Sequence, residues 1–322
     1  MSCFSPWAGQ WLGEYTSNGK RKISITSPYQ WEIDKDDPNV VYVPCGKCVG
    51  CRLDYARRWS DRLILELDHS KKACFITMTY NDDSIPYYVD DDSGEVFFTL
   101  HKPDVSTFMK DLRGRKEFLG NEIRFFCAGE YGDQTHRPHY HMILFGFDMD
   151  YLSSNGDVLT YHGKNELKQP HFSSRLLEDI WDNGYVQVGE ATYQSMNYVA
   201  RYTLKKAFGD DYTCDKPIQD EFTLMSRRPG IGSYYAMEHS DQIRELEKIK
   251  IGKQEIYWPS YLLEKALSED ELNKVKESRA EAANESINQM MSNTDLSFRE
   301  QLYVALTKKI NTVKILSRRG AI

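Results

Sequence analysis

The chain has 322 residues, 40% of them hydrophobic and 13% aromatic, which is enough to bury one substantial core with an appendage or two modest domains. No segment has the pattern of a secretory signal, and no apolar run approaches the roughly 18 residues of a membrane span. Lysine and arginine total 41 against 48 acidic residues, a net charge of −7, which argues against a protein that coats nucleic acid through a general basic surplus. A local basic surface remains compatible with this balance, and we expect a globular protein inside the cell.

The first hundred residues alternate between irregular, helical and extended patterns. Residues 1–44 are rich in aromatic side chains but have no periodic apolar pattern, so we expect an irregular leading segment. Apolar residues at helical spacing predict a helix over residues 53–67. Dense β-branched and aromatic residues predict a strand over 75–80, with a turn at 81–84 and a short extended segment at 96–100.

The central part of the chain predicts a helix followed by two paired strands. The helix begins near Pro103, and its buried stripe is Val105, Phe108, Met109 and Leu112. Strands are predicted over residues 123–128 and 139–147, the second with the apolar density of a strand buried on both faces. Residues 131–137 between them have the length of a hairpin loop.

The remaining elements are mostly helical. Residues 150–170 are polar and predict a loop, and they are followed by a short helix at 173–181, a strand at 185–189 and a helix at 194–206. From about Ala236 the composition shifts to charged segments. The two helix-compatible stretches of this region are residues 262–291 and 296–315.

The strongest chemical motif is Pro138-His139-Tyr140-His141. Alternate residues of a strand point to the same face, so His139 and His141 present two imidazoles about 7 Å apart along the backbone. Glu130 ends the preceding predicted strand, and a hairpin would return its carboxylate to them as a third ligand. This donor set could hold Mg²⁺ or Mn²⁺ and leave positions open for a phosphate oxygen. Histidines that merely pack in a buried strand are the alternative, and His136 is taken as a bystander or a DNA contact.

A second motif combines tyrosines with basic residues on one predicted helix. Tyr198 and Tyr202 are four residues apart and therefore share a helix face, with Lys205 or Lys206 beside them. A tyrosine oxygen can attack a phosphodiester and hold DNA covalently, and nearby cations favour the phenolate that does so. An ordinary aromatic stripe is the alternative. Because Arg201 lies within the same motif, we predict DNA contacts from Arg201 and Lys206.

Two further motifs are open to more than one interpretation. Cys45, Cys48 and Cys51 have the spacing of a metal knuckle, and Cys3 could complete a tetrahedral zinc site. Free structural thiols are the alternative, whereas an iron–sulfur cluster would require a cysteine where Tyr55 stands. In residues 227–232, Arg227, Arg228 and glycine amides could meet a DNA phosphate, or the segment is a plain surface turn. The remaining cysteines, Cys74, Cys127 and Cys214, are expected to be core or incidental residues.

The order of these motifs resembles the two-tyrosine rolling-circle initiators of the HUH superfamily: residues 77–80, then 137–141, then Tyr198-x-x-x-Tyr202-x-x-Lys205. Three further segments, residues 44–52, 129–132 and 225–232, look like the replication initiation proteins of microviruses, the gokushovirus branch especially. The resemblance covers roughly residues 1–260. Tyr140 stands where the family usually has an aliphatic residue, and its side chain is expected to face away from the metal.

The resemblance implies a nickase that acts on single-stranded or supercoiled phage origin DNA in the cytoplasm of the bacterial host. One tyrosine would cleave a strand and become linked to the 5′ phosphate, leaving a 3′ hydroxyl for the host polymerase, with a host helicase as a further partner. The second tyrosine would cut the regenerated origin, so that the strand is rejoined into a circle. His139, His141 and Glu130 would bind the metal, and Lys205 would position a tyrosine or the phosphate.

We therefore predict an α+β fold in three segments. Residues 1–69 form a cysteine-containing N-terminal segment with the first helix, residues 70–235 an HUH nickase domain with a central antiparallel sheet and flanking helices, and residues 236–322 a helical C-terminal extension. The alternatives are a transposase or relaxase of the same superfamily, a non-catalytic zinc-knuckle DNA-binding protein, and a metallohydrolase that activates water.

Overall fold

The computed structural model describes residues 3–16, 21–25, 40–132, 134–164, 169–208 and 217–318. Its contacts divide the chain into two compact units, one of Met1–Tyr55 with Asn273–Ile322 and one of Ala56–Leu272. These bounds differ from the predicted division at residues 69/70 and 235/236. Among the described residues, no helix combines the length and the apolar content that crossing a bilayer requires.

The larger unit is built on a seven-stranded sheet in which all neighbouring strands are antiparallel. The α+β class is therefore confirmed. In sheet order the strands are β12 (Phe222–Met225), β7 (Arg124–Tyr131), β8 (Pro138–Phe145), β4 (Ala73–Tyr80), β11 (Gly184–Glu190), β10 (Pro170–Ser174) and β9 (Leu159–Lys164).

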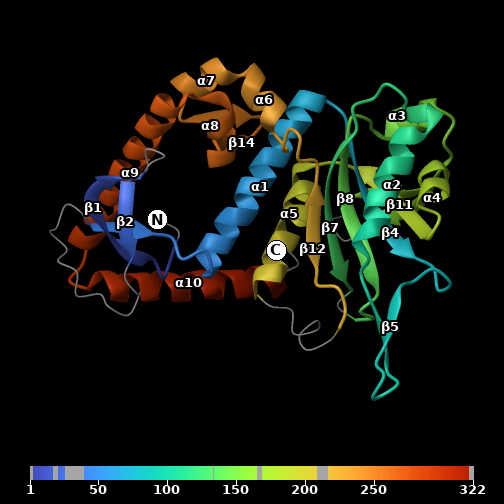
Figure 1. The fold of residues 1–322 in the computed structure, drawn as a ribbon, viewed down its shortest axis with the longest axis horizontal. Coiled ribbons are helices and arrows are strands. Elements are labelled where there is room, and N and C mark those ends of the chain that lie inside the picture. The colour runs from blue at the N-terminus through green and yellow to red at the C-terminus, as the bar shows by residue number, and fades with distance from the viewer. Residues whose placement is uncertain are drawn as a thin grey trace. The chain divides into compact units, whose positions relative to one another are not determined.

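Helices cover both faces of this sheet (Figure 1). On one face lie α2 (Lys102–Gly114), α3 (Met149–Ser154) and α4 (Arg175–Trp181), which bury the main hydrophobic core against the sheet. The four predicted apolar residues of α2 are its buried ones. On the other face lie α1 (Val49–Ser70), through a ring contact between Trp59 and Phe126, and α5 (Tyr193–Phe208).

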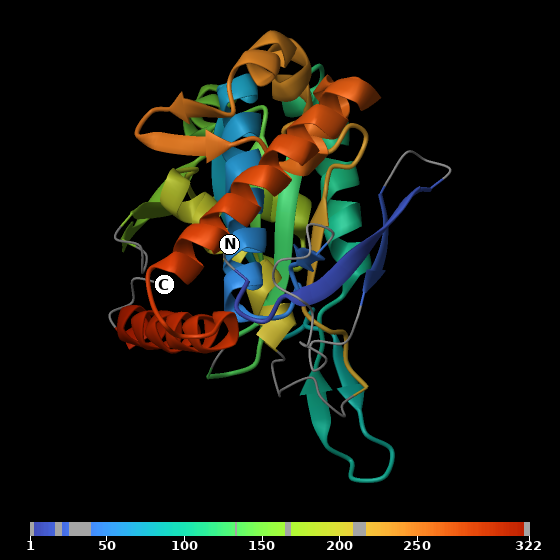
Figure 2. The same cartoon turned by 90° about the vertical axis from the view of Figure 1, so that its left-hand side faces the viewer.

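A few smaller elements complete the larger unit. A hairpin of β5 (Tyr87–Val89) and β6 (Val96–Phe98) projects from the sheet, as both views show (Figures 1 and 2). After the sheet follow α6 (Ser233–Glu238), α7 (Ser240–Glu245), the hairpin β13 (Lys248–Ile251) and β14 (Gln254–Tyr257), and α8 (Ser260–Ala266), with the short 3₁₀ helix η1 (Lys116–Phe118) placed after α2.

The smaller unit contains a three-stranded antiparallel sheet and two long helices. The sheet has the order β2 (Arg21–Ile25), β1 (Trp7–Tyr15), β3 (Val40–Val43). Helix α9 (Glu269–Ser292) continues into this unit and is followed by α10 (Phe298–Arg318). Its small core joins Ile287 of α9 to Phe298 of α10, whose ring lies 4.9 Å from that of Tyr42.

Three expectations are corrected. Residues 1–44 are not irregular throughout, since they contain β1, β2 and the start of β3; β1 exposes side chains on both faces along most of its length, so no alternation marks it. The predicted loop at 150–170 contains most of α3 and the exposed edge strand β9. The helical stretch at 262–291 is broken at Leu267 and Ser268, where Ser268 and Glu271 exchange hydrogen bonds in a capping box that begins α9.

Candidate functional site

A hairpin brings the carboxylate and the two imidazoles together. Strands β7 and β8 pair so that Glu130 stands opposite His139 and Ala128 opposite His141. The turn closes with a hydrogen bond from the Gly132 N–H to the Arg137 carbonyl, 3.1 Å. Because side chains alternate along strands, Glu130, His139 and His141 share the face of the sheet that α5 covers, as the predicted hairpin requires.

The three side chains are within coordination distance of a common point. Glu130 Oε1 lies 2.7 Å from His139 Nε2 and 2.9 Å from His141 Nε2, and the candidate ligand atoms all lie within 4.8 Å of one another. Glu130 is only 3% exposed. Burial opposes ionisation of its carboxyl, but hydrogen bonds from the two histidines and their charges outweigh burial and lower its pKa to about 2. The carboxylate is therefore ionised at neutral pH.

The far nitrogen of each imidazole is held by the neighbouring structure. His139 Nδ1 lies 3.1 Å from the Arg137 carbonyl oxygen, to which it can only donate, and His141 Nδ1 lies 2.9 Å from Thr77 Oγ1. Phe75 stacks on the His141 ring at 5.7 Å. Metal-ligating histidines are commonly fixed in this way through the nitrogen that does not bind the ion. The donor set and its surroundings thus fit a divalent metal with open coordination positions.

Helix α5 places Tyr198 against this cluster. The helix begins after Thr192, which exchanges hydrogen bonds with Ser195: the Thr192 N–H donates to Ser195 Oγ at 2.7 Å and the Ser195 N–H donates to Thr192 Oγ1 at 3.2 Å. Met196 and Val199 are buried beneath it. The half-buried Tyr198 ring lies 5.2 Å from the His141 ring, edge to face.

The other predicted residues of α5 are only partly described. Tyr202, Lys205 and Lys206 lie on the same helix, but their side chains fall outside the described part of the chain. Arg201 is half-buried, three residues after Tyr198. A helix carries residue 202 on the same face as residue 198, so the backbone agrees with the predicted pair of tyrosines.

A cavity of about 440 Å³ opens beside the cluster and contains residues that the sequence analysis missed. His139, His141 and Tyr198 line it, and so do the polar side chains of Thr135, Arg137, Gln187 and His171. His171 Nδ1 is buried and has no hydrogen-bond partner among the described residues. His171 stands opposite Gly189 on the strand next to β11. The missing signal was the strand β10, which lay unrecognised between a predicted loop and a predicted helix.

The turn at residues 227–232 corrects one expectation. The Gly230 N–H donates to the Tyr261 hydroxyl at 3.1 Å, and the Gly232 N–H donates to the buried Glu66 carboxylate at 2.6 Å. These amides are used within the fold and do not face a phosphate. Arg227 and Arg228 are exposed, so their predicted contact with DNA stays a prediction.

The cysteines separate into a cluster and a core set. Cys3, Cys45, Cys48 and Cys51 have their sulfur atoms within 4.8 Å of one another. Cys74 and Cys127 are fully buried in the sheet, as expected, and Cys214 lies outside the described residues. Tyr140 points into the core on the opposite face from the histidines, where its hydroxyl lies 2.8 Å from that of Tyr80.

The fold and site define an α+β protein with a candidate metal centre beside a helical tyrosine. Residues 73–207, which span the centre and α5, match the family model of the phage replication-associated protein ORF2. The chain is 31% identical to the replication-associated protein ORF2 of Spiroplasma virus 4, over 99% of this chain and 98% of that protein. The chain therefore belongs to this family of replication-associated proteins.

Two phage relatives match over shorter stretches. The replication-associated protein VP4 of Bdellovibrio phage phiMH2K is 31% identical over 62% of this chain and 59% of its own length. The replication-associated protein ORF4 of Chlamydia phage 1 is 28% identical over 71% of this chain and 55% of its own length. No solved structure matches the chain.

Proposed function

We propose that this protein initiates rolling-circle replication of a single-stranded DNA phage by nicking its origin and rejoining the strand through tyrosine. The observation that carries the proposal is the edge-to-face placement of Tyr198 at 5.2 Å from His141, within the same cavity as the Glu130, His139 and His141 cluster. An ordinary aromatic stripe would give no reason for a tyrosine to share a cavity with a set of metal-binding side chains. The printed names of the relatives agree with a role in replication.

Cleavage would proceed by transesterification. The Tyr198 phenol gives up its proton, and its oxygen forms an ester bond to the phosphorus of the scissile phosphodiester. The bond from phosphorus to the 3′ oxygen breaks, and that oxygen leaves with the electron pair and takes up a proton. The products are a 5′-phosphotyrosine and a free 3′ hydroxyl. Because the ester conserves the energy of the phosphodiester, a 3′ hydroxyl can later reverse the reaction and close a circle, with Tyr202 serving the second cleavage.

Mg²⁺ or Mn²⁺ is the proposed ion, and Glu130, His139 and His141 would hold it. When bound, such an ion supplies positive charge to the phosphate oxygens and the leaving oxygen. Thr77 and the Arg137 carbonyl keep the two imidazoles oriented toward the common point. Tyr198 rests against the His141 ring, so the same side chain orients both a ligand and the nucleophile. Lys205 would position a tyrosine or the phosphate, and Arg201, Lys206, Arg227 and Arg228 would contact DNA.

His171 is the proposed DNA contact on the far wall of the cavity. Its buried Nδ1 has no hydrogen-bond partner among the described residues, and an imidazole N–H is a suitable donor to a phosphate oxygen. His171→Gln should weaken binding of single-stranded origin DNA about tenfold without changing the Mn²⁺ concentration needed for cleavage. His162→Gln is the control, since that exposed histidine neighbours His171 at 6.3 Å but does not line the cavity. Equal affinity in the two variants would remove His171 from the proposed site.

The reaction is tested by incubating the protein with Mn²⁺ and single-stranded origin DNA and examining it on a denaturing gel. A protein band shifted by covalent DNA should form, and should be absent in the Tyr198→Phe, Tyr202→Phe double variant, which should still bind DNA. Cleavage that leaves two free ends and no shifted band would indicate a metallohydrolase. Binding without cleavage on verified origin DNA would indicate a DNA-binding module.

We further propose that the protein acts in the cytoplasm of the bacterial host, where a host helicase would unwind the nicked duplex and a host polymerase would extend the 3′ hydroxyl. Transposase or relaxase chemistry on another target would use the same residues. Competition between origin and unrelated single-stranded DNA in the gel assay distinguishes the two, because an origin-specific initiator should form adduct with the origin at least about tenfold faster.

A further inference from the structure

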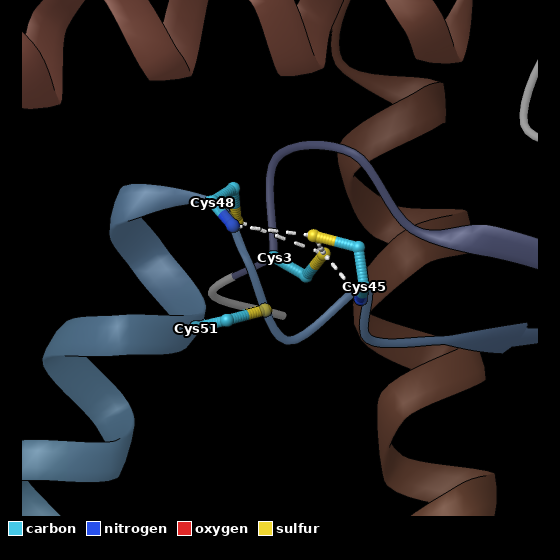
Figure 3. A group of neighbouring side chains, drawn as sticks. All are labelled: Cys3, Cys45, Cys48 and Cys51. Carbon is cyan, nitrogen blue, oxygen red and sulfur yellow. Dashed lines mark hydrogen bonds between the residues drawn. The ribbon is translucent and has the colours of Figure 1, made fainter. Parts of the chain in front are cut away.

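Four cysteines converge in the smaller unit, away in sequence from the catalytic motifs. Cys3 comes from the N-terminal segment, Cys45 and Cys48 from the loop after β3, and Cys51 from the first turn of α1 (Figure 3). Cys3 Sγ lies 3.6 Å from Cys45 Sγ and 3.8 Å from Cys48 Sγ. Cys3 and Cys51 are buried, with exposed fractions of 1% and 8%.

The sulfur separations identify the kind of site. A disulfide holds its sulfurs about 2 Å apart, so these pairs are not disulfides. Four thiolates bound to one zinc ion at about 2.3 Å, in a tetrahedron, lie about 3.8 Å from one another. The separations at Cys3 match the edges of such a tetrahedron.

The backbone around the cluster supports charged sulfurs. Amide groups of Phe4, Cys45 and Cys48 donate to Cys48 Sγ, Cys3 Sγ and Cys45 Sγ respectively, each at 3.3 Å. Donors aimed at sulfur stabilise a thiolate and orient it for a metal. Gly46, between the first two knuckle cysteines, has a φ of +73°, a conformation that glycine adopts at little cost. The loop is therefore shaped so that amides and sulfurs turn toward one centre.

We propose that Cys3, Cys45, Cys48 and Cys51 bind a structural zinc ion. Four protein ligands fill a tetrahedral zinc, so the ion has no open position for substrate and its role is to hold the fold. The strands β1 and β3 show what it would hold: Trp7 pairs with Val43, so the site lies at the shared end of these strands. It would fasten the start of β1, the end of β3 and the first turn of α1 together, closing the long segment between Cys3 and Cys45.

The proposal is tested on the full-length protein, first by its metal content. After dialysis against EDTA, which removes weakly bound Mg²⁺ or Mn²⁺, about one zinc ion per chain should remain. Cys48→Ser should lower the zinc content at least about fivefold, whereas His139→Ala, which alters the other candidate metal centre, should leave it unchanged. Zinc retained in Cys48→Ser, iron in place of zinc, or a chain purified with no bound metal would overturn the proposal.

A second measurement does not depend on the folding of a variant. Replacing the ion in the wild-type protein by Co²⁺ should give the visible absorption of tetrahedral cobalt with four thiolates, and a spectrum of any other coordination would contradict the ligand set. Hydrogen exchange after removal of zinc with a mercurial reagent should increase in peptides of residues 3–16 and 40–55 and not in those of β7 and β8. Neither readout involves DNA, so they stand or fall independently of the proposed nicking activity.

Discussion

Thr77→Val tests whether the hydrogen bond to His141 tunes the candidate metal centre. Thr77 stands opposite His141 in the β4–β8 pairing, and its hydroxyl lies 2.9 Å from Nδ1. Valine has nearly the same shape but no hydroxyl, so the substitution leaves Nδ1 of a histidine that is only 7% exposed without this partner. An unsatisfied buried polar group costs about 1–3 kcal/mol, which corresponds to about a 5- to 150-fold weaker binding of metal.

The assay is cleavage of single-stranded origin DNA at increasing Mn²⁺ concentration. The half-saturating concentration should rise about 10- to 100-fold, while the rate at saturating Mn²⁺ should stay within about twofold because Tyr198 is untouched. Thr79→Val is the matched control, since Thr79 stands opposite His139 on the same face and lines the same cavity. Its hydroxyl makes no hydrogen bond to a ligand among the described residues. An unchanged Mn²⁺ requirement in Thr77→Val would refute the assigned role of this hydrogen bond.

Two stability predictions follow from buried charges on α1. Glu66→Gln should lower the free energy of unfolding by about 3–5 kcal/mol in urea titrations, because Glu66 is fully buried and forms an ion pair with Arg124; the exposed Glu245→Gln serves as control, and a loss below about 1 kcal/mol would contradict the assignment. Asp61→Asn should instead stabilise the protein above pH 6, because burial raises the pKa of the Asp61 carboxyl from 3.8 to about 6 and the wild type must ionise a buried group there. The gain should be about 2 kcal/mol at pH 8, shrink as the pH falls through 6 and vanish below about pH 4; a gain that does not depend on pH would contradict this origin.

The catalytic half of the site follows from local rules of chain geometry. A hairpin between residues 130 and 139 needs only strand pairing and a seven-residue connection, and the alternation of side chains then fixes which face the histidines share. Helix α2 was predictable for the same reason, since its four apolar positions recur at helical spacing and are its buried residues. Short-range periodicity thus located Glu130, His139, His141 and Tyr198.

Residues placed by long-range pairing were not predictable in this way. His171 reaches the cavity because β10 pairs with β11, although the two strands are separated by α4. The edge strand β9 is mostly exposed and has no apolar alternation to mark it. The glycine amides at 230 and 232 were expected to face a phosphate, but they bond to Tyr261 and Glu66, whose positions depend on packing between distant segments.

The capping boxes show a signal that was present and overlooked. Ser268-x-x-Glu271 and Ser297-x-x-Glu300 each exchange hydrogen bonds between side chain and backbone at the start of a helix. The first of them marks the break that separates α8 from α9. Attention to this pattern would have divided the predicted stretch at residues 262–291 correctly.

The central claim is a covalent link between Tyr198 or Tyr202 and the 5′ phosphate of cleaved DNA. The most direct measurement is mass spectrometry of the protein after reaction with origin DNA and Mn²⁺, followed by nuclease and protease digestion. The account predicts a nucleotide attached to a tyrosine of α5, and its loss when both residues are changed to phenylalanine. A nucleotide attached to any other residue, or cleaved DNA without any attached nucleotide, would contradict it.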